Sequence, residues 1–484
     1  MSRDPMSHRR AIIQFLIAAL AAATASCRGD GVVAPPDTSP VVIAGTVPET
    51  GSWQADGLNM ARGFRLAVEM LNESGGIDGR QVRLALYDDG SDPGRAARIY
   101  RDLAAADSVD ALIGPFSSAV TEAVVPVAEQ AGMPLVAPLA ASPEIWAGKS
   151  RQWSVQMMNN ARDHLAGAVE VAARHGVETV ALVYENSRFP ISAADGVRDA
   201  AAREGLTLVM DEAYPVEGAD HSALTARARD LRADLFLGGG YTPDAVAFAK
   251  AVAGARYSPL LTSWTVGPSE PDFPDRVGVG AARCVIGNAP WVGTLDTSGP
   301  LANSATFQRR YHEAHGIAPG YTAAAGFGSV ELLSEAIRAS LAATGAIDNV
   351  AVRDHLFNTP TETVLGPFGV VPLGQADAGS QRLLVRLQLQ WQDDGKGGLV
   401  QRVIYPDGAA EAAPCVNPPA DIGHAAPSSL FRQDRHTGEA NDEGQHSAAR
   451  RVVPGPFRGV RHLRGRSATR RPKATGSWRL GAVS

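Results

Sequence analysis

From Val41 onward, short apolar runs rich in β-branched residues alternate with segments of helical periodicity. The run VVIAGTV at residues 41–47 predicts a first strand. The apolar residues that follow recur at the spacing of one helix face: Leu58, Ala61, Phe64, Val68 and Leu71. Gly75 and Gly76 end that helix. Regular alternation of this kind predicts parallel sheets covered by helices, which is an α/β fold.

The alternation occurs in two blocks, and these predict two lobes. The first block, residues 41–159, continues with the strand runs VRLALYDD, ALIG and PLVAP. The second block, residues 160–290, repeats the pattern with TVALVY, LTLVMDEAYP, ADLFLGGG and PLLTS. Two packed domains agree with the length of 484 residues, because a single hydrophobic core stops growing near about 250 to 300 residues.

The chain after residue 290 contains a long helical pattern, a shorter one and then β-like segments up to Ile404. We expect residues 291–357 to pack back on lobe 1 and residues 358–405 to pack back on lobe 2. The predicted architecture is therefore two doubly wound parallel-sheet lobes joined by a multi-strand hinge.

The expected place for a ligand follows from this architecture. In open parallel sheets, ligands bind beyond the carboxyl ends of the strands, where loops and helix N-termini offer unpaired N–H groups. Small-molecule sites also form preferentially at interfaces between domains. We therefore expect a ligand between the two lobes.

Charge and cysteine content exclude several classes of protein. The net charge of −6 argues against a nucleic-acid-binding protein, because neutralising phosphates requires a basic surface. Cys27, Cys284 and Cys415 lie far apart and suggest neither a disulfide framework nor a metal site. A small molecule is the expected partner.

The first 26 residues predict a signal peptide, because Arg9 and Arg10 precede an apolar run over residues 11–25. The sequence Thr24-Ala25-Ser26-Cys27 resembles a bacterial lipobox, in which the cysteine is acylated and becomes the mature N-terminus. Ordinary cleavage after Ala25 stays open as the alternative. Residues 27–40 are rich in Gly and Pro and predict a flexible tether.

The tail, residues 406–484, is rich in Pro, Gly, Ser and Arg. After Glu443 it contains Lys and Arg but neither Asp nor Glu. This composition predicts disorder. Contact with anionic envelope polymers or lipid headgroups through charge alone is a second interpretation.

The sequence offers no complete catalytic motif. Gly148-Lys149-Ser150 ends like a P-loop, but Pro143 occupies the position of its first glycine. His312 and His315 lack the HExxH spacing of a zinc helix. DDGSD at residues 88–92 predicts a turn and a helix N-cap rather than a calcium loop. We therefore expect neither an enzyme nor a cofactor or metal ion.

Several stretches resemble the branched-chain amino-acid-binding family of ABC-transporter receptors, which are leucine-binding-protein-like periplasmic solute-binding proteins of type I. The most specific are LNESGGIDGR and YDDGSDP, followed in the family's order by ALIGPFSS, VAEQAGMPLVAPLAASPE, VALVYENSRFP and DLFLGGGYTPD. The resemblance covers roughly Val41 to Pro406. It implies a type I periplasmic-binding-protein fold that closes two lobes around a small molecule.

The resemblance implies that two loops of lobe 1 hold a ligand carboxylate through Ser118, Ser142 and the backbone of Ala140. Hydroxyls beside helix-start N–H groups suit this task independently, because both stabilise an anion. Ser118 and Ser142 would also be good helix caps, and capping is compatible with binding.

Aromatic contacts to the ligand are expected from Trp53, Phe189 and Tyr241. The sequence departs from the family pattern after the strand PLLTS, where a carboxylate usually holds the ligand's ammonium group and where Trp264 and its neighbours stand instead. Glu270 or Asp272 could supply that carboxylate. Otherwise an apolar, aromatic or amide ligand competes with a free amino acid, and Trp264 could stack on it.

The resulting expectation is an extracytoplasmic solute-binding receptor of an ABC importer, located in the periplasm or cell envelope. Its partners would be an amino-acid-like, carboxylate or amide ligand, a membrane permease and, if Cys27 is acylated, the membrane itself. We expect a monomer. A sensor subunit that uses the same two-lobed clamp for signalling is the alternative.

Overall fold

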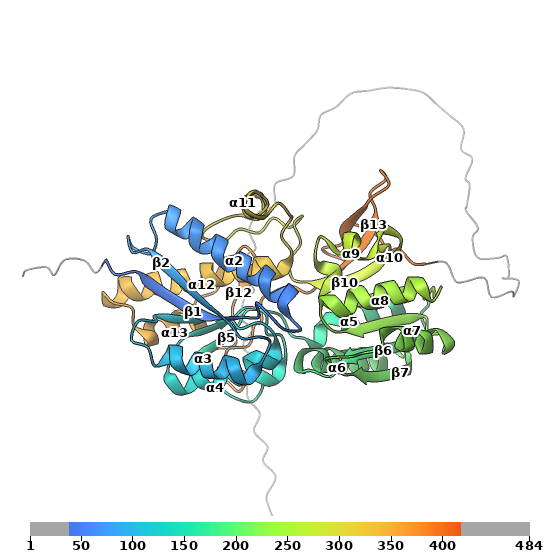
Figure 1. Cartoon of the computed structure of the whole chain (residues 1–484), viewed down its shortest axis with the longest axis horizontal. Helices are drawn as coiled ribbons and strands as arrows, with labels where there is room; N and C mark the ends of the chain where they lie inside the picture. Colours follow the sequence, from blue (N-terminus) through green and yellow to red (C-terminus); the bar gives the residue numbers. More distant parts are fainter. Residues whose placement is uncertain (1–37, 418–484) are drawn as a thin grey trace, which may run out of the picture. The chain divides into compact units, whose positions relative to one another are not determined.

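The computed structural model describes residues 38–417 (Figure 1). The predicted signal peptide, Cys27 and most of the basic tail lie outside these residues. Within the described part, no helix is both long and apolar enough to cross a membrane.

Lobe 1 is built on a five-stranded parallel sheet with the order β2-β1-β3-β4-β5. Its strands are β1 (Val41–Val47), β2 (Val82–Asp88), β3 (Ala111–Ile113), β4 (Leu135–Ala137) and β5 (Ser154–Gln156). The helices between them are α2 (Gln54–Glu73), α3 (Pro93–Ala104) and α4 (Ser118–Ala131). All residues of β1 are buried, as a strand covered on both faces requires.

Lobe 2 repeats this strand order with β7-β6-β8-β9-β10. Its parallel strands are β6 (Thr179–Glu185), β7 (Thr207–Tyr214), β8 (Leu235–Gly239), β9 (Leu261–Trp264) and β10 (Val285–Ala289). Its longer helices are α5 (Arg162–Ala173), α6 (Arg188–Glu204), α7 (His221–Asp230) and α8 (Thr242–Gly254). Short elements complete both lobes: η1 (Pro143–Ile145), η2 (Gly267–Ser269), α9 (Phe273–Val277) and α10 (Val279–Ala282).

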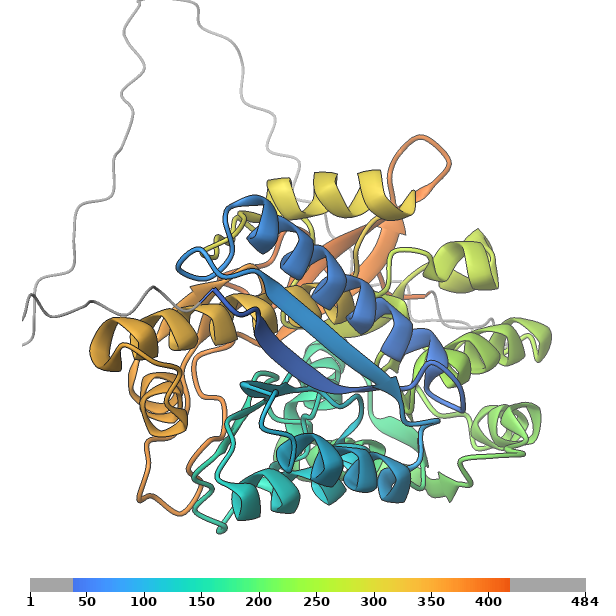
Figure 2. The ribbon, with the colours of Figure 1, turned by 60° about the vertical axis from the view of Figure 1, so that its left-hand side comes forward.

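The chain after lobe 2 contributes to both lobes. Helices α11 (Ser304–His315), α12 (Tyr321–Thr344) and α13 (Asn349–Asn358) join the elements of lobe 1, and α11 lies beside α2 (Figure 2). Strands β13 (Leu387–Asp393) and β14 (Leu399–Tyr405) extend the lobe 2 sheet in antiparallel orientation. The lobes are thus connected three times, after β5, after β10 and before β13.

The predicted boundary of the last return segment is wrong in part. The hairpin β11 (Thr361–Thr363) and β12 (Gly366–Phe368) packs with lobe 1, although residues 358–405 were expected to return to lobe 2. Val364, Leu365 and Phe368 are buried in the lobe 1 core. Only β13 and β14 join the second sheet, because a three-residue hairpin strand carries too little periodicity to show which core it enters.

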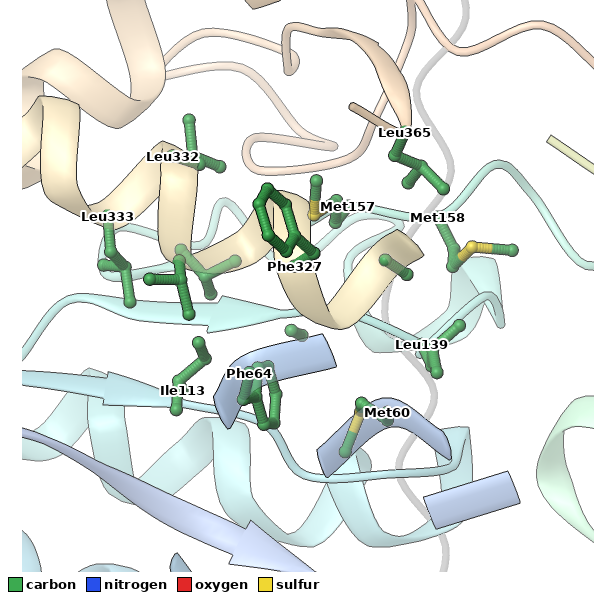
Figure 3. Packing of buried hydrophobic residues seen from close by; sticks show 14 of the residues in the cluster. Met60, Phe64, Ile113, Leu139, Met157, Met158, Phe327, Leu332, Leu333 and Leu365 are labelled. Atoms are coloured by element: carbon green, nitrogen blue, oxygen red, sulfur yellow. The ribbon is translucent and has the colours of Figure 1, made fainter. Parts of the chain in front are cut away.

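Helix α12 is the central support of lobe 1. Most of its residues are buried, and it packs along α2. Figure 3 shows Met60 and Phe64 of α2 in one cluster with Phe327 of α12. A side chain at Gly63 would collide with the carbonyl of Ala323, so this glycine allows the two helices to approach closely.

The start of α3 confirms one local prediction. The side chain of Asp92 accepts a hydrogen bond of 2.9 Å from the Arg95 N–H, and Pro93 begins the helix. Asp88 and Asp89 accept hydrogen bonds from the loop N–H groups of Gly90 and Ser91. The sequence DDGSD therefore forms a turn followed by a helix N-cap.

A disulfide joins Cys284 to Cys415, and their Cα atoms lie 5.4 Å apart. The expectation that the cysteines form no disulfide is therefore wrong. The partners are 131 positions apart, and only the fold brings them together. The start of the predicted disordered tail is also ordered: the Asn417 N–H donates to the Leu260 carbonyl at 3.0 Å, so residues 406–417 pack on lobe 2.

Candidate ligand-binding site

The N-terminus of α4 in lobe 1 brings three predicted ligand contacts together. Ser118 begins this helix, and its Oγ accepts hydrogen bonds of 3.1 Å from the N–H groups of Ala141 and Ser142. The Ala140 carbonyl accepts a hydrogen bond of 3.0 Å from the side chain of Gln156. Ser118, Ala140 and Ser142 are all fully buried. The two loops after β3 and β4 therefore form one polar surface.

This surface suits an anion. Ser117 caps α4 through a hydrogen bond from the Val120 N–H, with a φ of 75°. Among residues 38–417, no acceptor is found for the N–H groups of Ser118 and Ala119. Free N–H groups at a helix start carry partial positive charge and stabilise negative charge. Because Ser118 accepts two hydrogen bonds, its own proton is available to a ligand carboxylate.

Four aromatic side chains meet at the lobe interface, and we call them the aromatic arc: Trp53, Phe116, Phe189 and Tyr241. The Tyr241 ring lies 5.4 Å from Trp53, 5.8 Å from Phe116 and 5.8 Å from Phe189, measured between ring centroids. Trp53 and Phe116 come from lobe 1, whereas Phe189 and Tyr241 come from lobe 2. The three predicted aromatic contacts near residues 53, 189 and 241 are thus brought together.

Phe116 was missed in the sequence, although it stands directly before Ser117 in the motif GPFSS. Trp53 Nε1 and the Tyr241 hydroxyl are buried polar atoms of the arc without a well-formed hydrogen bond, although the hydroxyls of Ser117 and Ser187 lie near that of Tyr241. Burial raises the pKa of Tyr241 well above its usual value, so its hydroxyl stays protonated. Both atoms can serve a ligand, since buried polar atoms are normally paired.

Trp264 does not join the aromatic arc, and its predicted stacking on the ligand is wrong. Its ring stacks on Phe248 at 5.2 Å and meets Phe236 edge to face at 5.0 Å, within the core of lobe 2. Strand alternation explains this, because Trp264 ends β9 on the face of the sheet that α8 covers. The next residue, Thr265, instead donates its hydroxyl to the Gly240 carbonyl.

The two acids that could replace the missing carboxylate already have partners. Glu270 accepts hydrogen bonds from Thr322 at 2.8 Å and from Asn59 at 3.3 Å, both in lobe 1. Burial, reinforced by the charge of Asp56, raises the pKa of Glu270 to about 8. Asp272 pairs with Arg276 at 2.7 Å. Neither acid therefore supplies an uncommitted carboxylate to the aromatic arc.

Hydrogen bonds connect the lobes on both sides of the arc. Asp56 of α2 accepts from the Thr242 hydroxyl at 2.5 Å and from its N–H at 3.3 Å, at the start of α8. Burial raises the pKa of Asp56 to about 6, with Thr242 opposing this shift. On the other side, the Ser192 hydroxyl lies 3.0 Å from that of Ser142. Sequence patterns gave no signal for these pairs, because each joins residues far apart in the chain.

A cavity of about 330 Å³ opens beside Glu270 at the edge of the lobe interface. Its lining includes the charged residues Arg62, Asp275 and Arg276. The two alternative acids, Glu270 and Asp272, line this cavity, but Ser118, Ala140, Ser142 and the residues of the aromatic arc do not. We therefore place the candidate ligand site at the arc and the α4 N-terminus, where the predicted contacts converge.

Comparison with known proteins gives the following likenesses. A 222-residue stretch is 31% identical to Leu/Ile/Val-binding protein homolog 8 of Brucella abortus (strain 2308), covering 44% of this chain and 55% of that protein. The chain thus spans about half the length of the first curated relatives it matches. A longer match, 26% identical, joins it to Leu/Ile/Val-binding protein homolog 7 of Brucella melitensis, covering 78% of this chain and 94% of that protein.

Solved structures share the fold. A branched-chain amino acid transporter substrate-binding protein from Streptococcus pneumoniae, in complex with isoleucine, matches with a TM-score of 0.64 at 21% identity, covering 76% of this chain and 100% of that chain. A solute-binding protein of an ABC transporter from Rhodopseudomonas palustris BisB5, in complex with 3,4-dihydroxybenzoic acid, matches with a TM-score of 0.66 at 18% identity. This match covers 77% of this chain and 99% of that chain.

The family model described as periplasmic binding protein matches residues 40–385, which include both sheets up to the start of β13. This match covers most of the chain and agrees with the two-lobed type I fold. The family consists of binding proteins, not enzymes. The chain belongs to the periplasmic binding protein family.

Proposed function

We propose that this protein is the extracytoplasmic solute-binding receptor of an ABC importer and that it binds a small carboxylate between its lobes. One observation carries this proposal: the N-terminus of α4, with Ser118, lies against the loop of Ala140 and Ser142 and shares the lobe interface with the aromatic arc. A helix start with free N–H groups beside buried aromatic rings fits a molecule with one anionic end and one apolar or aromatic end.

In this proposal Ser118, Ser142 and the Ala140 backbone hold the carboxylate, while Trp53, Phe189 and Tyr241 surround the rest of the ligand. Isoleucine and 3,4-dihydroxybenzoic acid are the ligands named for two structural neighbours. A carboxylate with an aromatic or amide group suits the site better than a free amino acid. The reason is that Thr265 occupies the place where an acid for the ammonium group was expected, and the two buried acids whose charges act on Tyr241, Glu185 and Asp56, are already hydrogen-bonded to Ser187 and Thr242.

The family implies a location outside the cytoplasm. We further propose that residues 1–26 direct export, that Cys27 is acylated and that residues 27–40 tether the lobes to a membrane. Mass spectrometry of the mature protein tests this proposal: a lipid-modified N-terminal Cys27 supports it, whereas a free mature N-terminus at Ser26 contradicts it.

The ligand is best found by thermal denaturation of the exported protein in the presence of amino acids, amides and aromatic acids. A ligand that binds only the folded state raises the melting temperature by mass action, with about 2.7 kcal/mol gained at a concentration of 100 Kd. At least one carboxylate is expected to raise it. The absence of a shift with every carboxylate would contradict the receptor function.

The importer partnership is tested separately. The proposed membrane permease should respond to the ligand-bound receptor, and the receptor should be a monomer in solution. Reconstituted transport that requires both the permease and this protein supports the proposal. Ligand binding without any stimulation of transport would favour a sensor that uses the same clamp. Light scattering during size-exclusion chromatography checks the monomer.

A further inference from the structure

Two polar side chains in the first connection between the lobes have no hydrogen-bonding partner. Asn159 and His164 are only 5% and 3% exposed. Both side-chain polar atoms of Asn159 and the Nε2 atom of His164 are buried without a hydrogen bond in the described part of the chain. Buried polar atoms are normally paired, so three such atoms within six positions call for an explanation.

These residues lie next to the candidate site. The His164 ring meets Phe189 of the aromatic arc edge to face, with 5.1 Å between ring centroids. The Ala161 N–H donates to the Ala141 carbonyl at 2.8 Å, which ties the same connection to the loop of Ala140 and Ser142. The connection therefore borders both the arc and the proposed carboxylate site.

The protonation state of His164 defines what its free nitrogen can bind. Burial, opposed by a hydrogen bond to the Asn159 backbone and assisted by the charge of Arg386, lowers the pKa of His164 to about 4. The ring is thus neutral near pH 7. If Nδ1–H donates to the Asn159 carbonyl, Nε2 carries a lone pair and requires a donor from outside the protein.

We propose that Asn159 and His164 form a polar subsite that recognises a second, uncharged group of the ligand, either a hydroxyl or a carboxamide. A hydroxyl can donate its one proton to His164 Nε2 and accept from the Asn159 amide, whereas a carboxamide can also donate its second N–H to the Asn159 carbonyl oxygen. This inference rests on the proposed binding of a carboxylate ligand by Ser118 and Ser142, and it adds a requirement that those residues do not impose.

Charged groups fit this subsite poorly. A second carboxylate would face the lone pair of Nε2, and the only donor there would be the Asn159 amide. An ammonium group would lack an anionic partner, because the nearby Asp163 pairs with Arg386 at 3.5 Å. The subsite therefore selects a neutral polar group over an ionised one.

The test uses pairs of carboxylates of similar shape that differ in one polar group: 4-hydroxybenzoate with 4-methylbenzoate, tyrosine with phenylalanine, threonine with valine, and asparagine with leucine. Affinities are measured by isothermal titration calorimetry. In at least one pair, the polar member is expected to bind about tenfold more tightly or better, because sites built for a hydroxyl reject analogues that lack it.

Variants then assign the preference to the two residues. His164→Phe and Asn159→Leu should each remove the preference while the apolar member of the pair still binds. His164→Gln keeps an acceptor and should retain part of the preference, which a purely structural role of the ring would not predict. His315→Phe is the matched control, because His315 also has an unpartnered Nε2 and packs edge to face on Tyr311 at 4.6 Å.

Three outcomes would overturn the proposal. Apolar members that bind as tightly as polar ones in every pair would exclude the subsite and leave the receptor function standing. A preference unchanged in both His164→Phe and Asn159→Leu would place its origin elsewhere. A crystal structure of the liganded protein in which only an ordered water contacts both side chains would show a solvation site. Failure of every carboxylate to bind would instead contradict the proposed function itself.

Discussion

The two lobes share one strand order but bring different chemistry to their interface. Both sheets place the first strand between the second and the third, and residues that follow strand ends in the two lobes meet at the interface, as Phe116 and Tyr241 do. In lobe 1 these ends lead to Ser118 and Ser142 and to free N–H groups. In lobe 2 they lead to Gly239, Gly240 and Tyr241. The topology thus determines the position of each ligand contact. The residue type at that position determines which group of the ligand it can bind.

The lobes also differ in the interactions that stabilise them. Lobe 2 carries the disulfide Cys284–Cys415 and the antiparallel strands β13 and β14. Lobe 1 relies on α12, where the buried carboxylate of Glu331 accepts hydrogen bonds from the N–H groups of Leu301, Ala302 and Val364. A covalent constraint therefore holds lobe 2, and a buried helix with one acceptor network holds lobe 1.

The largest effect is expected from the lobe 1 side of the site. Replacing Ser118 and Ser142 together with Ala should weaken binding of a carboxylate ligand at least about a hundredfold. The reason is that each hydrogen bond to a charged group contributes about 1.5 to 3 kcal/mol. Calorimetric titration measures the loss, and circular dichroism checks the fold. Unchanged affinity would move the carboxylate away from lobe 1.

The lobe 2 side separates ligand contacts from core residues. Trp264→Ala should cost about 3 to 5 kcal/mol of stability, as expected for a buried tryptophan, and should leave the affinity of the folded protein nearly unchanged. Tyr241→Ala should do the reverse and mainly lower the affinity. Chemical denaturation and calorimetry distinguish the two effects. If Trp264→Ala greatly lowered the ligand affinity but left the stability unchanged, Trp264 would be a ligand contact rather than a core residue.

Because only lobe 2 carries the disulfide, its removal is expected to destabilise lobe 2 locally. Replacing Cys284 and Cys415 with Ser should destabilise the protein by about 2 to 5 kcal/mol, the usual cost of losing a native disulfide. Limited proteolysis should then cut first within residues 406–417. Hydrogen exchange should increase in β13 and β14 rather than in α12. An equal increase in hydrogen exchange in both lobes would show that the disulfide stabilises the whole molecule.

The smallest effect concerns the protons at the lobe interface. Because the pKa of Glu270 is raised from 4.5 to about 8, the folded state binds more protons than the unfolded state between these values. Stability should therefore fall as pH rises through this range. Asp56, Glu185 and Glu331, with pKa values raised to about 6, 7 and 7, add to the fall at lower pH.

The contribution of Glu270 stands out between pH 7 and 8. Loss of its proton should cost about 1 kcal/mol over this unit, since one pKa unit corresponds to about 1.4 kcal/mol. In a protein of this size that is a change in melting temperature of about 1 °C, because the entropy of unfolding grows with chain length. Glu270→Gln should flatten the pH dependence there. A wild-type melting temperature that rises from pH 7 to 8 would contradict the buried, protonated carboxyl.

The sequence by itself determined the two α/β blocks and the N-cap at Asp92, whereas the grouping of Ser118 with Ser142 was implied by the resemblance to a family. These depend on local periodicity, on short-range capping and on motifs at strand ends, all of which are written in neighbouring residues. The expectation of a ligand beyond the carboxyl ends of the strands then follows from the general behaviour of open parallel sheets.

Only the tertiary structure decided the disulfide Cys284–Cys415, the hydrogen bond of Asp56 to Thr242 and the removal of Trp264 into the lobe 2 core. Each joins positions far apart in the chain or depends on which face of a strand a side chain leaves. Asn159 and His164 became visible for the same reason. An unpaired polar atom is defined by what surrounds it in space, and no local pattern of residues records that.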